Sequence, residues 1–195
     1  HGGAIYIYSG ITVHIENTLF NNNNAMRGGA IYVNENQTVT IINITLISNN
    51  AEEFGGGIYM SNRSNIELNN SFISENDSPL GGSIYIINQA LINGRNNNFD
   101  NNFGEIGAGI YNNEGTIIME NTSFTNNIVS NSGGAIFNTG SLLLAGCTFD
   151  HNQAGMDNTQ NIISNAKKKY TLQFNSLIFE NNEINYIASG ENWGF

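Results

Sequence analysis

The chain has 195 residues and a formal net charge of −10, with 6 basic side chains against 16 acidic ones. Recognition of nucleic acid needs clustered Lys and Arg, so this composition predicts no nucleic-acid partner. The sequence also lacks the run of about 18 apolar residues that a membrane-spanning helix requires, and we expect no membrane insertion by this segment.

A motif of glycine, a small residue, Ile and an aromatic residue recurs about every 26 residues. Its copies begin at Gly2, Gly28, Gly55, Gly81, Gly107 and Gly133. Repeats of roughly 20 to 50 residues indicate a solenoid, propeller or array, in which one unit is too small to bury its apolar face alone. We therefore expect one continuous body.

Each repeat contains three short extended segments separated by turn residues. The first is the glycine motif itself, in which side chains alternate with a period of two. The second carries apolar residues two positions apart, as in Val13 and Ile15, except where Ile92 is followed by Gly94. The third is an apolar residue followed three positions later by Asn. The sequence predicts an all-β fold, a right-handed parallel β-helix of about seven coils of about 26 residues with three short strands per coil.

Helical repeats, leucine-rich repeats and propellers fit the sequence less well. Asn, Gly, Thr and Ile dominate, so helix formation would be unfavourable. The Leu-x-x-Leu-x-Leu signature is absent, and a propeller blade needs about 40 residues or more.

The Asn that ends the third segment recurs in step with the coils. Stacked strands lie about 4.8 Å apart, so equivalent residues form a column, in which each Asn amide can donate to one neighbour and accept from the other. We predict a structural ladder of Asn23, Asn49, Asn76, Asn102, Asn127, Asn152 and Asn182.

The first segment should place its Ile and its aromatic residue on opposite faces. We expect the Ile column (Ile5, Ile31, Ile58, Ile84, Ile110 and Ile136) in the core and the aromatic column on the surface. This outward stripe is the predicted ligand-binding surface, formed by Tyr6, Tyr32, Tyr59, Tyr85, Tyr111 and Phe137. The reverse arrangement, with the rings inside, stays open because Tyr hydroxyls need partners and β-helix cores can stack rings.

Catalysis and metal binding have little support in the sequence. A glycosidase needs converging carboxylates, whereas Asp100 and Asp150 share a column two coils and about 10 Å apart. His1, His14 and His151 make no metal-ligand spacing, and His151 takes a position that Asn fills elsewhere, which favours a substitute in the ladder. We predict no enzyme, no cofactor and no metal site.

The pattern changes after Asn152. Residues 153–169 are predicted to be an irregular loop insertion that holds the basic run Lys167-Lys168-Lys169, and residues 186–195 a degenerate C-terminal end. The basic run is a candidate for docking an acidic neighbour. Because the chain opens directly on a repeat, we expect residues 1–195 to be one β-helix segment of a longer protein, or to stack end to end on another copy.

Two smaller features concern single residues. The only cysteine, Cys147, excludes an internal disulfide, and we expect a small buried side chain. The acceptor pattern for N-glycosylation occurs at Asn36, Asn43, Asn62, Asn69, Asn76 and Asn121.

Gly-Gly-Ala-Ile at Gly2, Gly28 and Gly133, together with Phe-x-x-Asn at Phe20, Phe99, Phe124, Phe149 and Phe179, resembles the repeat pair of the chlamydial polymorphic membrane proteins. Similar repeats occur in adhesin-like surface proteins of other microbes, including methanogenic archaea. The resemblance covers nearly the whole chain and implies a secreted, autotransporter-like passenger at the cell surface.

These observations lead to three hypotheses about function. The first is a noncatalytic extracellular adhesin or surface stalk that binds a glycan or protein on another cell. The second is a structural subunit of an extracellular filament or appendage, which binds copies of itself by end-to-end or lateral stacking. The third is a polysaccharide-active enzyme.

Overall fold

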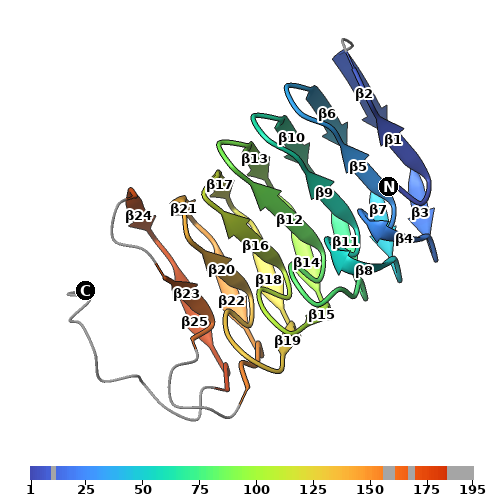
Figure 1. The fold of residues 1–195 in the computed structure, drawn as a ribbon. Coiled ribbons are helices and arrows are strands. Elements are labelled where there is room, and N and C mark those ends of the chain that lie inside the picture. Colours follow the sequence, from blue (N-terminus) through green and yellow to red (C-terminus); the bar gives the residue numbers. More distant parts are fainter. Residues whose placement is uncertain (10–11, 156–160, 167–169, 184–195) are drawn as a thin grey trace.

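The computed structural model describes residues 1–9, 12–155, 161–166 and 170–183, and it is an all-β parallel β-helix. Three sheets of seven parallel strands run along the molecule, and each strand pairs with its equivalents one coil before and after (Figure 1). The predicted fold class is confirmed, although the chain makes about six turns between the first and seventh strand of a sheet rather than about seven. The described residues contain no helix that could cross a membrane.

The first sheet contains the glycine motif and the residues that follow it. Its strands are β1 (Ile5–Ile7), β5 (Ile31–Val33), β9 (Ile58–Met60), β12 (Ile84–Ile87), β16 (Ile110–Asn113), β20 (Ile136–Asn138) and β23 (Ile163–Asn165). From β1 to β20, Ile pairs with Ile and aromatic with aromatic in successive coils, for example Ile84 with Ile110, whereas Phe137 pairs with Ser164 of β23. From the second coil to the sixth the Ile side chains are fully buried, which confirms that this column belongs to the core.

The second sheet contains the paired apolar residues and shows why Gly94 replaces the second of them in one coil. Its strands are β2 (Thr12–Glu16), β6 (Thr38–Ile42), β10 (Asn65–Asn69), β13 (Leu91–Arg95), β17 (Thr116–Glu120), β21 (Ser141–Ala145) and β24 (Leu172–Asn175). Gly94 pairs with Met119 of the next coil, and a Cβ at Gly94 would lie 2.5 Å from the Met119 sulfur. The missing side chain therefore makes room for the long Met119.

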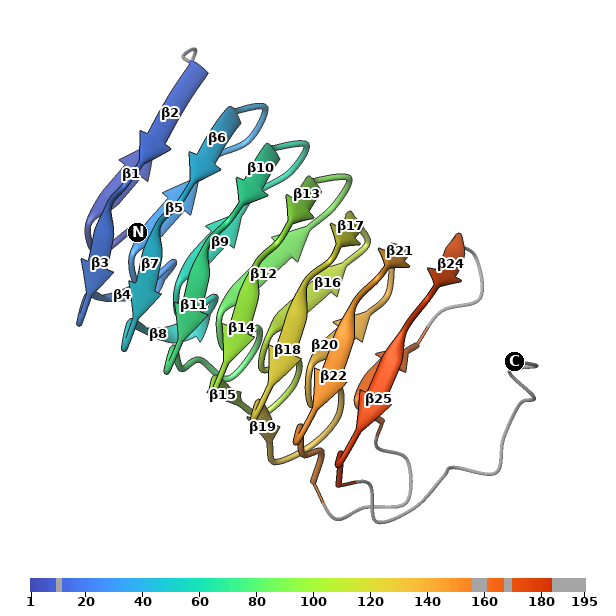
Figure 2. The same ribbon diagram turned by 180° about the vertical axis from the view of Figure 1, so that it is seen from behind.

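The third sheet holds the apolar residue of the Asn motif. Its strands are β3 (Leu19–Asn21), β7 (Thr45–Ile47), β11 (Phe72–Ser74), β14 (Asn98–Asp100), β18 (Ser123–Thr125), β22 (Thr148–Asp150) and β25 (Ile178–Glu180) (Figure 2). The rings of Phe99 and Phe124 stack at 4.8 Å between centroids, and those of Phe124 and Phe149 at 5.1 Å. A stacked ring column thus fills the core beside the Ile column.

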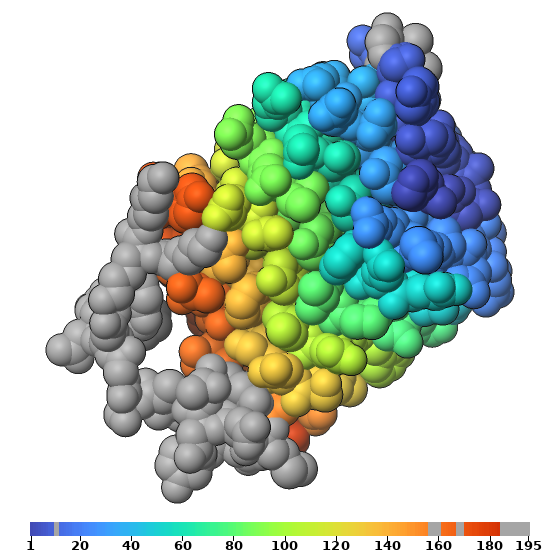
Figure 3. Space-filling view, viewed as in Figure 1, coloured from blue at the N-terminus to red at the C-terminus, as the bar shows by residue number. Residues whose placement is uncertain are grey.

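A fourth, interrupted side connects the third sheet back to the first. It contains the pairs β4 (Asn24–Arg27) with β8 (Asn50–Phe54) and β15 (Phe103–Gly104) with β19 (Ile128–Val129), joined by single bridges such as Asp77 with Phe103. Each coil therefore has a fourth wall beyond the three predicted strands. In the space-filling view the coils follow one another as neighbouring bands of colour (Figure 3).

The prediction of an irregular loop over residues 153–169 is wrong for part of that range. β23 lies within it and pairs with β20, and Gln153 bridges both Ile128 and Glu183. Parallel strands pair through backbone groups, so Ile163 can pair with Ile136 of the preceding coil although its own coil lacks the two glycines of the motif. Residues 156–160, the basic run at 167–169 and the predicted degenerate end at 186–195 lie outside the described residues.

Candidate functional site

The Asn of the third segment forms a continuous hydrogen-bonded column. From Asn23 to Asn152, each Nδ2 donates to the Oδ1 of the Asn in the following coil, at 2.8–3.1 Å, and Asn182 is the last acceptor. The same Oδ1 also accepts the backbone N–H of the preceding Asn, as Asn76 Oδ1 does from Asn49 at 3.1 Å. The second hydrogen of Nδ2 goes to a backbone carbonyl, such as Leu46 O for Asn76. The five inner amides, Asn49 to Asn152, are fully paired in the wall of the core and present nothing to a ligand.

Each coil turns a corner after the third sheet through a residue in the left-handed backbone conformation. This residue comes directly before the ladder Asn and is not the ladder Asn itself. Asn101 and Asn126, both with φ of 53°, lie directly before Asn102 and Asn127. His151 occupies this corner position with φ of 52°, so its interpretation as a ladder substitute is wrong: the ladder residue of its coil is Asn152.

The aromatic column lies outside the core but is largely covered. Neighbouring rings from Tyr32 to Phe137 stack at 4.7–5.6 Å between centroids. Tyr32, Tyr59 and Tyr85 are only 7%, 5% and 5% exposed, whereas Tyr6 is 43% exposed. The expected surface stripe is therefore wrong for its three central members, which form a second, separate apolar cluster.

Side chains from the fourth side cover the Tyr rings. Phe54 and Leu80, each just before the glycine of its motif, pack against the Tyr cluster, and the Phe54 ring lies 4.7 Å from that of Tyr85. Arg27 holds this cover in place, because its guanidinium pairs with Glu53 at 2.7 Å and lies 5.2 Å from the centre of the Phe54 ring. These contacts remove most of the ring area that a ligand would need.

The same cover shifts the acidity of the Tyr hydroxyls. Burial raises the pKa of Tyr59 to about 12, because the phenolate would lose its hydration. Burial also raises the pKa of Tyr85, although a hydrogen bond with Asn113 at 3.2 Å opposes the shift. The hydroxyls of Tyr59 and Tyr85 are therefore neutral over the physiological pH range.

The carboxylates considered for catalysis act as hydrogen-bond acceptors on the outer face of the third sheet. Thr125 lies between Asp100 and Asp150 in register and donates to Asp100 at 2.6 Å. A hydrogen bond from Asn181, at 2.9 Å, and contact with His151 lower the pKa of Asp150. Among the described residues, no three His, Cys, Asp or Glu side chains are grouped as metal ligands.

Sequence reasoning missed a second Asn column. One column of the first sheet changes from apolar to Asn along the molecule. It contains Val33, Met60 and Ile86 in the earlier coils and Asn112, Asn138 and Asn165 in the later ones. Asn112 Nδ2 donates to Asn138 Oδ1 at 2.6 Å, and its Oδ1 accepts the Gly115 N–H at 2.8 Å. For Asn112 and Asn138 the sequence does carry a signal, because a Gly follows each Asn by two or three residues, whereas no Gly follows Asn165 in this way.

Cys147 is fully buried, as expected, and burial raises the pKa of its thiol. It lies at the corner between the second and third sheets, where Ser71, Asn97 and Thr122 occupy equivalent positions one coil apart. It is a structural residue of that corner.

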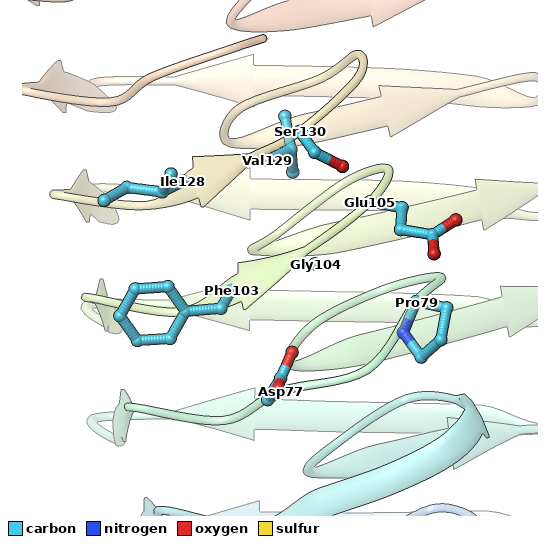
Figure 4. Close-up of a pocket in the computed structure, with 8 residues that line it drawn as sticks. All are labelled: Asp77, Pro79, Phe103, Gly104, Glu105, Ile128, Val129 and Ser130. Atoms are coloured by element: carbon cyan, nitrogen blue, oxygen red, sulfur yellow. The ribbon is translucent and has the colours of Figure 1, made fainter.

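A shallow groove of about 510 Å³ lies on the fourth side over coils three to five. Phe103 and Ile128, neighbours in register, lie towards one end, with Glu105 and Pro79 towards the other and Asp77 between them (Figure 4). Gly104 belongs to its floor, where a Cβ would approach Ser78 O to 2.7 Å. Periodicity could not reveal this groove, because its residues differ from coil to coil.

Comparison with known proteins gives one match. No curated protein and no solved structure matches the chain. The family model for the Chlamydia polymorphic membrane protein repeat matches residues 17–34 and 121–139. Each matched segment runs from the corner before the third sheet, through the ladder Asn and the fourth side, to the next strand of the first sheet. The chain therefore carries, at these two sites, a repeat like that of the Chlamydia polymorphic membrane proteins.

Proposed function

We propose that this chain is a noncatalytic, cell-surface β-helix that acts as an adhesin-like segment or stalk, and that its lateral surface meets a glycan or a protein on another cell. The observation that carries the proposal is the match to the polymorphic membrane protein repeat, which falls on the segments that build the ladder and its corners. That name refers to membrane proteins, and a surface position for this chain follows from it by analogy.

The architecture supports a role as a spacer. The core columns of apolar side chains are packed from coil to coil and the Asn ladder is hydrogen-bonded from coil to coil, so consecutive coils are tied together along the described length. Repeat proteins of this kind present extended lateral surfaces rather than one enclosed pocket.

Within this proposal the aromatic column contributes only where its rings are accessible. Tyr6 is 43% exposed, and Tyr111 and Phe137 are half-buried. Stacking of a sugar or an apolar side chain on these rings is the contact that we expect.

Surface labelling tests the location. An antibody against the purified chain should label intact cells of the source organism, and protease treatment of those cells should remove the epitope. Labelling only after lysis would refute the surface assignment. Electron microscopy of the native assembly then separates a stalk that ends in a ligand contact from a filament of identical subunits.

A further inference from the structure

The groove on the fourth side lies where a column of outward-facing polar residues is interrupted by two apolar ones. Going up the coils, this column has Asn50 and Asp77, then Phe103 and Ile128, and then Gln153. Ile128 is 36% exposed, and Phe103 is half-buried. Two adjacent large apolar side chains on the outer surface thus form a small apolar strip inside the groove. Such strips mark binding surfaces, and their central residues contribute most of the binding free energy of a protein–protein contact.

The charged groups of the groove have one sign. Asp77 and Glu105 are both exposed, and neither side chain has a hydrogen bond or an ion pair with any described residue. None of the described residues that line the groove is basic, and Arg27 is engaged with Glu53 on another part of the fourth side. Unlike Asp100 and Asp150, these two carboxylates are available to a partner.

We propose that this groove binds an extended segment of a partner protein in which Lys or Arg lies next to an apolar residue. The aliphatic stem of such a side chain packs on Phe103 and Ile128, and its cationic group reaches Asp77 or Glu105. A cation close to the Phe103 ring gains further attraction from the ring face. The net charge of −10 draws a basic partner towards the chain and repels an acidic one.

The chemistry of the lining favours a basic peptide over a neutral glycan. Sugar hydroxyls both donate and accept, and glycan sites provide both kinds of group. The polar side chains here are two carboxylates, which only accept, and the Ser130 hydroxyl. The volume of about 510 Å³ accommodates one or two side chains of a peptide.

This inference rests on the proposed surface function in one respect, namely that the partner protein belongs to another cell. Binding to the groove is tested on the purified chain with a synthetic probe, so failure of the groove and failure of the surface location are separate results.

The probe is the blocked hexapeptide Ser-Leu-Lys-Leu-Lys-Ser, compared with a peptide in which Gln replaces both lysines. Titration is followed by NMR, and we expect the lysine peptide to shift the backbone amides of Gly104 and Ser130. The variant with Asp77→Asn and Glu105→Gln should bind about fivefold more weakly and with less salt dependence. Phe103→Ser, which keeps both carboxylates, should also weaken binding about fivefold.

The matched control is the variant with Glu35→Gln and Glu67→Gln, which removes the same charge from exposed sites elsewhere and should bind as the wild type does. Thermal unfolding establishes that each variant is folded. Equal weakening by the control, equal shifts with the glutamine peptide, or shifts confined to other surfaces would overturn the proposal. So would maltohexaose shifting Gly104 and Ser130 when the lysine peptide does not.

Discussion

Asn76 donates from Nδ2 to Oδ1 of Asn102 at 3.1 Å, and the same oxygen accepts the backbone N–H of Asn76 at 3.0 Å. Asn102 in turn donates to Ile73 O and to Asn127 Oδ1. Both amides are completely buried. A buried polar group is stabilising only while it is paired, so each rung of the column depends on the rungs beside it.

The first prediction concerns that dependence. Asn102→Ala removes the acceptor of two hydrogen bonds from Asn76 and takes one donor away from the carbonyl of Ile73. We expect the free energy of unfolding to fall by about 3 kcal/mol in urea titrations. The control Asn93→Ala, on the outer face of the second sheet, should change it by less than about 0.5 kcal/mol. Similar losses for the two variants would contradict a ladder that stabilises the fold.

The second prediction concerns pH. The pKa of Tyr59 is about 12 in the folded chain and near 10.0 in the unfolded one. The unfolded state therefore loses its proton first as the pH rises, so the stabilisation by Tyr59 is complete below about pH 10 and is lost between about pH 10 and pH 12. The urea midpoint should fall over this range.

Tyr59→Phe provides the control for the pH effect. Phe keeps the ring stack without the ionising hydroxyl, so the midpoint of this variant should fall less steeply with pH. Tyr32, Tyr85, Tyr111 and Cys147 also have raised pKa values and contribute to the slope that remains. An unchanged slope would show that Tyr59 does not ionise on unfolding in this range.

The third prediction concerns the glycine corner before the first sheet. Gly81 has φ of 68°, and a Cβ there would lie 2.4 Å from Ile84 O. Gly81→Ala should lower the free energy of unfolding by about 2 kcal/mol or more. Asn101→Ala, at a left-handed corner that already carries a Cβ, should lower it by only about 1 kcal/mol. The reverse order would show that the glycine corner can relax.

The fourth prediction separates the six candidate glycosylation sites. Asn36, Asn43 and Asn121 lie on exposed corners with φ between 47° and 59°, whereas Asn76 is 0% exposed within the ladder. Secreted from a eukaryotic host, the folded chain should carry glycans at exposed corners and none at Asn76. Mass spectrometry of glycopeptides checks this, and a glycan at Asn76 in folded protein would contradict the buried ladder.

The coil architecture and its columns could be predicted because the chain repeats them. A parallel coil places residue i above residue i plus about 26, so Phe99, Phe124 and Asn102 could be assigned to columns without coordinates. Identical neighbours also limit which residue types can occupy a column, and this limit identified the Asn ladder.

What could not be predicted depends on residues that change from coil to coil. The aromatic column is covered because Arg27, Phe54 and Leu80 occupy the position before the glycine, and their side chains share no obvious type. The groove likewise depends on two apolar residues, Phe103 and Ile128, at a position that is polar in other coils. A search for periodic residues does not detect such positions.

The side-chain carbonyls of the Asn ladder all face the coil that precedes them. Strand dipoles within a sheet largely cancel, but these aligned amides add along the axis. The ladder therefore contributes a dipole along the axis of the rod, with its negative end at the first coil and its positive end at the last. Because each rod also carries a net charge of −10, two rods lying side by side repel one another, and the aligned amides make that repulsion weaker when the rods point in opposite directions than when they point the same way.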